Sequence, residues 1–301
     1  MRIGISVGST YPTDDHRYGP RTMVEQARAA YRAGLDSLTV GDHHATGPVP
    51  YVQNVPVVGR LLAEWSDRQA GCLFLVPLWP PVLMAEQIGT LAALSSGKFI
   101  VQAGVGGGSA QFAAVGQSLS ERGLRTDEGI RIAQALLSGE TASSDAFGIE
   151  GARIAPLPPD GLEWWIGGGV EKSIERAARL GDCWYGNADL TPETARVALD
   201  IYREACARLD RSPVRLPIRK DVYIAEDAAE AEAVGDRLVA AHYRGFDRMA
   251  VAYGDPASVA EQLAVFGEIG FTDIIVRIMT AGPEETVRSV ELAGEVKRLL
   301  S

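Results

Sequence analysis

The chain has 301 residues, of which 46% are hydrophobic and 23% charged, and its net charge is −10. This composition is typical of a globular protein with a large core and excludes a disordered chain. The negative charge comes with no basic stripe, and no apolar run is long enough to span a bilayer, so we expect neither a nucleic-acid partner nor a membrane partner.

Apolar strand patterns alternate with helical patterns along the whole chain. Eight segments are predicted as buried strands, namely Arg2–Gly8, Ser37–Val40, Cys72–Val76, Phe99–Ala103, Glu163–Ile166, Cys183–Gly186, Ile218–Ala225 and Asp273–Ile278. Helical patterns cover about 21–33, 57–65, 82–94, 126–137, 172–180, 192–209, 227–243, 256–269 and 283–300. This alternation predicts one α/β domain over residues 1–301, a (β/α)8 TIM barrel with loop insertions after strand 4 (104–125) and before strand 5 (139–161).

The second predicted strand ends abruptly in Gly41, Asp42, His43 and His44. Residues at the carboxyl ends of barrel strands face the mouth, where barrel enzymes carry out their chemistry. Titratable groups at such a mouth favour a functional site, whereas the alternative is an Asp-capped loop with a histidine packed for structure. Because consecutive residues leaving a strand point to different sides, Asp42 and His43 cannot both face the cavity in regular strand geometry.

Two glycine-rich turns follow the fourth and fifth predicted strands. The first is Gly104–Ser109, and the second runs from Gly167 to Ser173 and opens a helix. Glycine lets the backbone approach a ligand, the first N–H groups of a helix attract phosphate, and the Ser173 hydroxyl could contribute. Neither turn matches a nucleotide fingerprint, and each alone could be a tight turn. Together they favour a phosphate-bearing cofactor.

Several arginines lie near these predicted strand ends. Thr126, followed by two acidic residues, is typical of a helix start, with Arg122 and Arg125 before it as possible anion contacts. Arg219 and Arg277 lie in the last two predicted strands. If these two face inward they need partners such as Asp221 or Asp273, so we expect ion pairs inside the barrel.

Cysteine usage and the first residues suggest a cellular location. Cys72, Cys183 and Cys206 are isolated, odd in number and without metal-ligand spacing. They predict no metal site and a reducing compartment without disulfides. Since the chain runs straight into a strand without a cationic leader, we expect a cytoplasmic protein.

The order of these motifs resembles the bacterial luciferase-like superfamily. The resemblance is carried by residues 34–43, 75–78 with 85–87, 97–99 with 104–106, 122–128, 165–168 with 176–182, and 254–256 with 259–263. It implies a (β/α)8 barrel with inserted loops, commonly dimeric, and so a homodimer is expected. It also implies an enzyme that is either a flavin-dependent monooxygenase or an oxidoreductase that uses the deazaflavin coenzyme F-420.

Carried over residue by residue, the resemblance places His43 beside the isoalloxazine ring, with Asp42 as the second candidate catalytic residue and His44 facing the loop. Residues 75–77 match the bulged end of strand three that backs the ring in deazaflavin members. With Ser173 added, the implied cofactor-binding residues are Val76, Pro77, Gly104, Gly106, Gly107, Gly167, Gly168, Gly169 and Ser173. Tyr11 and Trp79 are candidates for the substrate pocket.

Three departures from the family pattern bear on the function. Trp79 stands where many relatives have Arg or His. Val105 lies near the position at which luciferase has a phosphate-binding arginine. No acidic residue follows Gly106, where the sugar-phosphate dehydrogenases of the family carry a catalytic glutamate. The compact chain length and the uncharged Val105 favour an oxidoreductase that transfers a hydride between F-420 and a small organic substrate. The alternatives are an FMN-dependent monooxygenase supplied by a separate flavin reductase and a non-catalytic flavin-binding protein.

Overall fold

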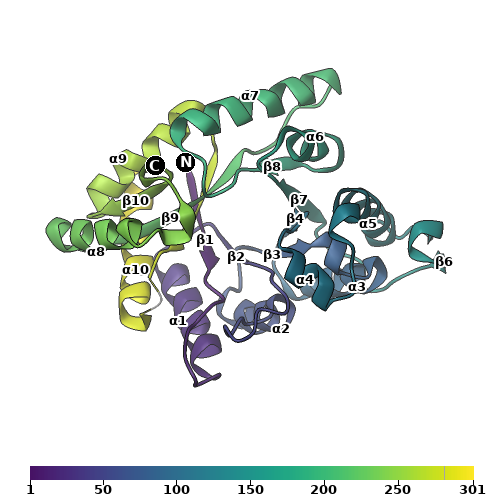
Figure 1. Ribbon diagram of the computed structural model, residues 1–301, viewed down its shortest axis with the longest axis horizontal. Coiled ribbons are helices and arrows are strands. Elements are labelled where there is room, and N and C mark those ends of the chain that lie inside the picture. Colours follow the sequence, from purple (N-terminus) through teal and green to yellow (C-terminus); the bar gives the residue numbers. More distant parts are fainter. Residues whose placement is uncertain (281) are drawn as a thin grey trace.

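The computed structural model describes residues 1–280 and 282–301. Its centre is a curled parallel sheet of nine strands in the order β10-β9-β11-β1-β2-β3-β4-β7-β8, and helices surround the outer side of this sheet (Figure 1). The strands are β1 Arg2–Val7, β2 Ser37–Val40, β3 Gln69–Leu75, β4 Phe99–Gly104, β7 Leu162–Gly167, β8 Cys183–Tyr185, β9 Pro217–Ile224, β10 Val251–Gly254 and β11 Asp273–Ile278. A separate antiparallel hairpin is formed by β5 Ala142–Ser144 and β6 Ile149–Ala152.

Ten α-helices are present in the described residues, and most of them follow a strand. Their bounds are α1 Tyr18–Arg32, α2 Asn54–Leu61, α3 Pro81–Leu94, α4 Ser109–Ala114, α5 Arg122–Leu137, α6 Glu171–Leu180, α7 Pro192–Arg208, α8 Ala228–Ala240, α9 Pro256–Ile269 and α10 Pro283–Leu299. None of these helices combines the length and apolar character needed to cross a membrane.

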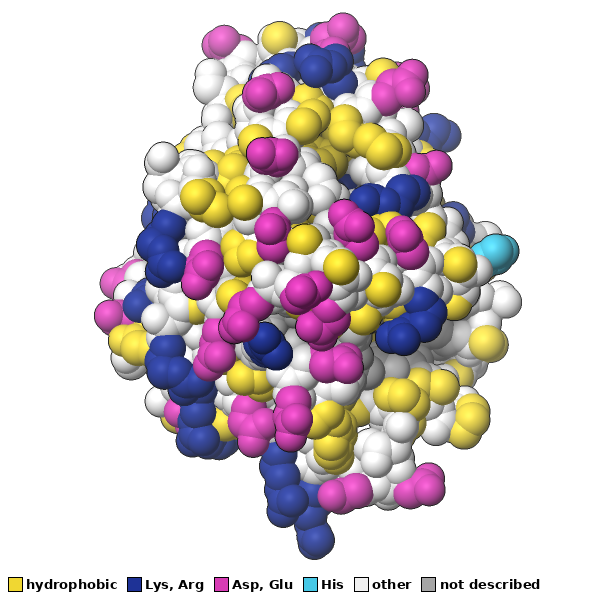
Figure 2. Space-filling model, turned by 90° about the vertical axis from the view of Figure 1, so that its left-hand side faces the viewer, with side chains coloured by type: hydrophobic (Ala, Val, Ile, Leu, Met, Phe, Trp, Pro, Cys, Tyr) yellow, Lys and Arg dark blue, Asp and Glu magenta, His cyan; other side chains and the backbone are white. Residues whose placement is uncertain are grey.

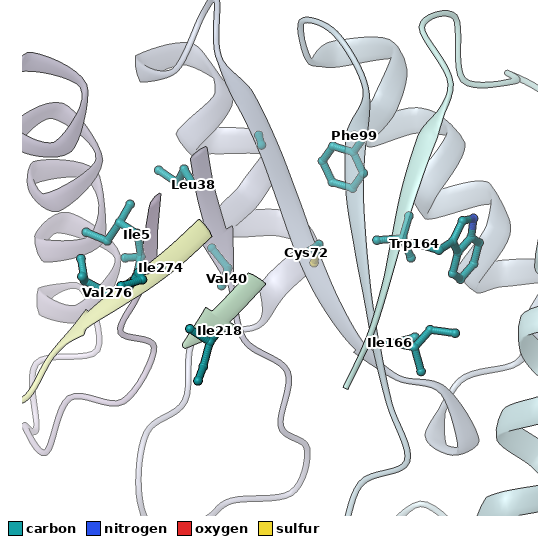
Figure 3. Close-up of a cluster of buried hydrophobic side chains, with 14 of the residues drawn as sticks. Ile5, Leu38, Val40, Cys72, Phe99, Trp164, Ile166, Ile218, Ile274 and Val276 are labelled. Carbon is teal, nitrogen blue, oxygen red and sulfur yellow. The ribbon is translucent and has the colours of Figure 1, made fainter. Parts of the chain in front are cut away.

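Alternation along each strand divides the core into two layers. Ile3, Ile5 and Val7 of β1 belong to the large cluster between sheet and helices, part of which is drawn in Figure 3. The alternate residues face the inner side, where Ile100 of β4 and Ile275 of β11 share a smaller buried cluster. Because β4 and β11 are not neighbours in the sheet, this contact requires the sheet to curl. Each such burial stabilises the fold by roughly 1.5–3 kcal/mol.

The α/β class with a curled parallel sheet is confirmed, but one strand of this sheet and the β5–β6 hairpin were missed, and several helix starts were wrong. The prediction missed β10, which pairs only with the carboxyl half of β9, from Val251 beside Asp221 to Gly254 beside Ile224. Two of its four residues, Ala252 and Gly254, have low strand propensity, which leaves no clear strand pattern. Helix α5 begins at Arg122, and Thr126 lies inside it, where its hydroxyl donates to the Arg122 carbonyl at 2.6 Å.

Charged groups occur at both ends of the inner face. The Arg2 guanidinium lies 3.1 Å from Asp273 at the amino end, and Arg219 lies 2.9 Å from Asp221 nearer the carboxyl end. The expected ion pair is therefore confirmed for Arg219. On the outside, acidic and basic side chains are interspersed over the face that Figure 2 shows. All three cysteines are free and buried, and the described residues hold no cluster of three potential metal ligands.

Candidate active site

A buried carboxylate joins the carboxyl ends of β2 and β3. Asp42 is 1% exposed, and its Oδ2 accepts hydrogen bonds from the Leu75 backbone N–H and from Trp79 Nε1, both at 2.8 Å. Two N–H donors on one carboxylate oxygen stabilise its buried charge. Asp42 therefore fixes the end of β3 and the indole of Trp79 beside the β2 loop. A catalytic role for Asp42 and a substrate role for Trp79 stay predictions.

The second histidine of the loop completes this network. His44 Nε2 lies 3.1 Å from Asp42 Oδ1, and the His44 ring packs edge-on against Trp79 at a centroid distance of 5.5 Å. The Asp42 carboxylate raises the pKa of His44 above its ordinary value, against an opposing effect of burial. The ion pair with Asp42 holds the His44 side chain on the interior side of the loop.

Replacing His44 by alanine should destabilise the protein more in acid than in alkali. A histidine whose folded pKa lies above the unfolded value of 6.5 stabilises the fold fully below that value. This stabilisation is lost as the pH rises through the folded pKa. Urea unfolding of wild type and variant at about pH 5.5 and about pH 8.5 measures the difference. Equal losses at both pH values would show that the ion pair does not form.

His43 lies on the exposed side of the same loop. Its Nδ1 is 3.4 Å from Gln111 Oε1, and its ring meets Tyr51 edge-on at 5.3 Å between centroids. Partial burial lowers the pKa of His43, and Arg277 and Arg244 lower it further, while Gln111 and the nearby carboxylate oppose the shift. The imidazole is therefore neutral at neutral pH. With Nδ1–H directed at Gln111, Nε2 is free to accept a proton.

Gln111, which the sequence did not single out, connects this loop to the first glycine turn. Its Oε1 accepts from the His44 backbone N–H at 2.7 Å, and its Nε2 donates to the Gly107 carbonyl at 3.2 Å. It belongs to α4, whose Phe112 packs into an apolar cluster with Leu75 at the end of β3.

The first glycine turn adopts backbone conformations that favour glycine. Gly106 has a φ of +66°, and a Cβ there would lie 3.3 Å from the Phe112 ring. A side chain at Gly106 is therefore disfavoured by both conformation and space. Gly104 ends β4, and Val76 and Pro77 form a buried single turn directly after β3. The structure thus brings His43, the end of β3 and this turn together through Asp42 and Gln111.

The second glycine turn leads into a helix without a side-chain cap. A Cβ at Gly168 would lie 2.2 Å from the Ser173 Cβ, so only glycine fits there. At Gly169, which is exposed, a Cβ would meet only the end of the Asn187 amide, at 2.8 Å. Within residues 1–280 and 282–301, no side chain caps the N-terminus of α6, which leaves its first N–H groups available to an anion.

The arginines around this turn contact other protein groups. Buried Arg176 binds Asp127 of α5 and donates to Ser173 Oγ at 3.4 Å, so it links the two helices beneath the turn. Arg122 donates to the Leu119 carbonyl, and Arg125 stacks on Phe147 at 4.3 Å. These contacts agree with a structural role for both. The two glycine turns are neighbours, because β4 pairs with β7.

Tyr11 lies apart from the glycine turns, on the loop after β1. Its hydroxyl donates to the Gly8 carbonyl at 2.8 Å and accepts from Gln26 Nε2 at 2.9 Å. Burial raises the pKa of Tyr11 well above its ordinary value, so the phenol stays protonated. Its ring lines a cavity together with Arg244 and Arg277. A role for Tyr11 in a substrate pocket stays a prediction.

Comparisons with known proteins point to one group of enzymes. The family model described as luciferase-like monooxygenase matches residues 1–290. An F420-dependent glucose-6-phosphate dehydrogenase of Rhodococcus erythropolis is 25% identical over 88% of this chain and 90% of that protein. Another from Amycolatopsis mediterranei is 29% identical over 57% of this chain and 55% of its own length. The matched region thus spans about half the length of several curated relatives.

Two solved structures share the fold over their whole length. An F420-dependent secondary alcohol dehydrogenase in complex with an F420–acetone adduct has a TM-score of 0.83 at 18% identity, with 100% of this chain and 99% of that chain covered. The oxygenating constituent of 3,6-diketocamphane monooxygenase from Pseudomonas putida, in complex with FMN, has a TM-score of 0.82 at 17% identity, with the same coverage. At these identities the likeness establishes the fold alone.

Proposed function

The chain belongs to the luciferase-like monooxygenase family, and from this premise we propose that it is an oxidoreductase that transfers a hydride between coenzyme F-420 and a small organic substrate. The observation that carries the choice of cofactor is the first glycine turn. Val105 offers no charge to a terminal phosphate at the position near the phosphate-binding arginine of luciferase, which disfavours FMN. The similarity to an F420-dependent dehydrogenase over most of both chains supports the same choice.

The residues present fit a phosphate-bearing cofactor. Gly168 lets the turn pack directly against Ser173, and Gly169 leaves an exposed backbone with no side chain in front of the uncapped N-terminus of α6. The backbone of this turn and the Ser173 hydroxyl would hold a phosphate, and Gly104, Gly106 and Gly107 would border the cofactor. Val76 and Pro77 would back its ring, because Asp42 holds the preceding Leu75 in place.

When bound, the deazaflavin supplies a carbon that accepts or donates a hydride. His43 accepts or donates the accompanying proton. Its neutral Nε2 accepts the proton of an alcohol hydroxyl in the oxidation direction, and its protonated form donates to a carbonyl oxygen in the reduction direction. Asp42 and Gln111 act as positioning residues that fix the loop on both sides of His43.

The proposal includes a closed (β/α)8 barrel. An isolated parallel bridge between Gly186 and Ile218 joins the end of β8 to β9, which supports closure of the ring of eight strands, with β10 added beside β9. Segments 104–125 and 139–161 would then be insertions on this barrel. A homodimer and a cytoplasmic location are part of the same proposal, on the grounds of the family resemblance and of the free cysteines.

The second candidate is the FMN-dependent monooxygenase with a separate reductase, which is favoured by the FMN-containing structural neighbour. Turnover distinguishes the two. With the protein present, reduced F-420 in air should regain its oxidised fluorescence only after a ketone or aldehyde is added. A panel that pairs acetone with a 2-oxo acid provides the acceptors. Rapid oxygen consumption with reduced FMN and a flavin reductase, without oxidation of F-420 by any acceptor, would establish the monooxygenase instead.

A further inference from the structure

The cavity that Tyr11 lines lies at the carboxyl ends of β1 and β11, on the opposite side of β2 from the glycine turns. Its volume is about 310 Å³, and Tyr11, Gln26, Tyr243, Arg244, Arg277 and Thr286 are among its lining residues. The two arginines carry charge, and no acidic side chain lines the cavity within the described part of the chain.

Positive charge exceeds negative charge around this cavity. The fully buried Asp221 carboxylate forms ion pairs with Arg219 Nε at 2.9 Å and with Arg244 Nε at 3.8 Å. It also accepts a hydrogen bond from the Tyr243 hydroxyl at 3.0 Å. Arg219, Arg277 and Arg244 together lower the pKa of this carboxyl against the effect of burial. One carboxylate thus balances one of three guanidinium groups, which leaves an excess of positive charge that a bound anion would compensate.

The backbone that carries Arg244 has an uncommon conformation. Arg244 has a φ of +52° and His242 a φ of +57°, in the left-handed region that non-glycine residues rarely adopt. Conformations of this kind gather at ligand sites, where the surrounding structure holds them in place. Here the turn brings the Arg244 side chain to Asp221 and to the cavity.

The cavity adjoins the histidine loop. A Cβ at Gly41 would lie 3.9 Å from Arg277 Nη1, so the Arg277 guanidinium reaches across the mouth to the end of β2. Arg277 and Arg244 are also close enough to His43 to affect its protonation. We propose that the substrate is an organic anion whose carboxylate or phosphate group binds between Arg244 and Arg277 and whose reacting carbon–oxygen bond faces His43. The placement of the reacting carbon–oxygen bond beside His43 rests on the proposed function, whereas the anion site is inferred from the geometry of the cavity alone.

Calorimetric titration of the purified full chain, with and without F-420, tests the anion site. The probes are sodium acetate and inorganic phosphate, in a buffer low in chloride. With F-420 bound at the phosphate turn, we expect saturable one-site binding of at least one probe. Tighter binding of acetate indicates a carboxylate substrate, and tighter binding of phosphate indicates a phosphate ester. Arg277→Met and Arg244→Met should each weaken it at least about ten-fold, because each removes charge-assisted hydrogen bonds. Arg277→Lys keeps the charge and should lose less.

Arg131→Met is the matched control, because Arg131 is exposed on α5 and 4.0 Å from Glu128. It should bind both probes as wild type does. The absence of saturable binding to wild type, or unchanged binding in both arginine variants, would overturn the anion site. Fluorescence titration of the same proteins with F-420 separates the two proposals. Wild type that binds an anion and not F-420 supports the site and contradicts the proposed cofactor.

Discussion

Replacing His43 by alanine should lower turnover by about 10²–10⁴-fold, the usual effect of removing one positioned acid–base group. His43 lies on the exposed side of the β2 loop with Nδ1 facing Gln111, whereas the Nε2 atom of His44 lies 3.1 Å from the buried Asp42. Affinity for the cofactor should change by no more than a few fold, because the proposed phosphate contacts lie at the second glycine turn. Steady-state kinetics together with F-420 fluorescence titration of the variant measures both quantities.

The pH profile adds a readout that a structural role would not affect. Partial burial lowers the pKa of His43 below 6.5, so its neutral form persists to lower pH than in an ordinary histidine. Alcohol oxidation needs that neutral base, and its rate should fall only as the pH drops through the lowered pKa. His43→Ala should remove this acidic limb. His44→Ala should have the smaller effect on turnover. Near-normal turnover in His43→Ala, or a larger loss in His44→Ala, would refute the role of His43.

Gly169→Asp should weaken cofactor binding roughly 100- to 1,000-fold. The new carboxylate would stand at the uncapped N-terminus of α6, where a phosphate is proposed to bind. Two like charges about 4 Å apart repel by about 4 kcal/mol at an effective dielectric constant of about 20, which corresponds to nearly three orders of magnitude in affinity. Fluorescence titration with F-420 measures the loss.

Gly169→Ala is the matched control for this change. Both variants carry the same Cβ and displace the same flexible amide of Asn187, which a Cβ would approach to 2.8 Å. Only the aspartate adds a charge, so the alanine variant should bind within a few fold of wild type. A folded Gly169→Asp protein that binds F-420 normally would show that the turn is not part of the site. Gly168 is unsuitable for the test, because any side chain there collides with Ser173.

Strong local patterns made most of the fold predictable. Alternation in Ile3, Ile5 and Val7 reflects a strand with one face against helices, and each predicted strand of this kind is present. Strand β10 escaped prediction because its four residues gain their stability from pairing with β9, a contact distant in sequence. Helix α5 extends four residues before the predicted start because a threonine can hydrogen-bond back to a carbonyl inside a helix as well as cap one.

The candidate site was predictable only where a strand end carries an unusual residue. His43 and Asp42 were found because they follow β2, and the glycine turns because they follow β4 and β7. Gln111, Tyr51 and Arg244 lie in segments without periodicity, and their importance depends on loops that meet in space. No pattern within one segment indicates such a meeting.

The cofactor is the central claim, and titration of the purified protein with F-420 and with FMN, followed by fluorescence, tests it most directly. We expect saturable binding of F-420 with a higher affinity than FMN, since Val105 offers no charge to a terminal phosphate and the glycine turns leave room for a longer tail. Tighter binding of FMN than of F-420 would contradict the proposed function.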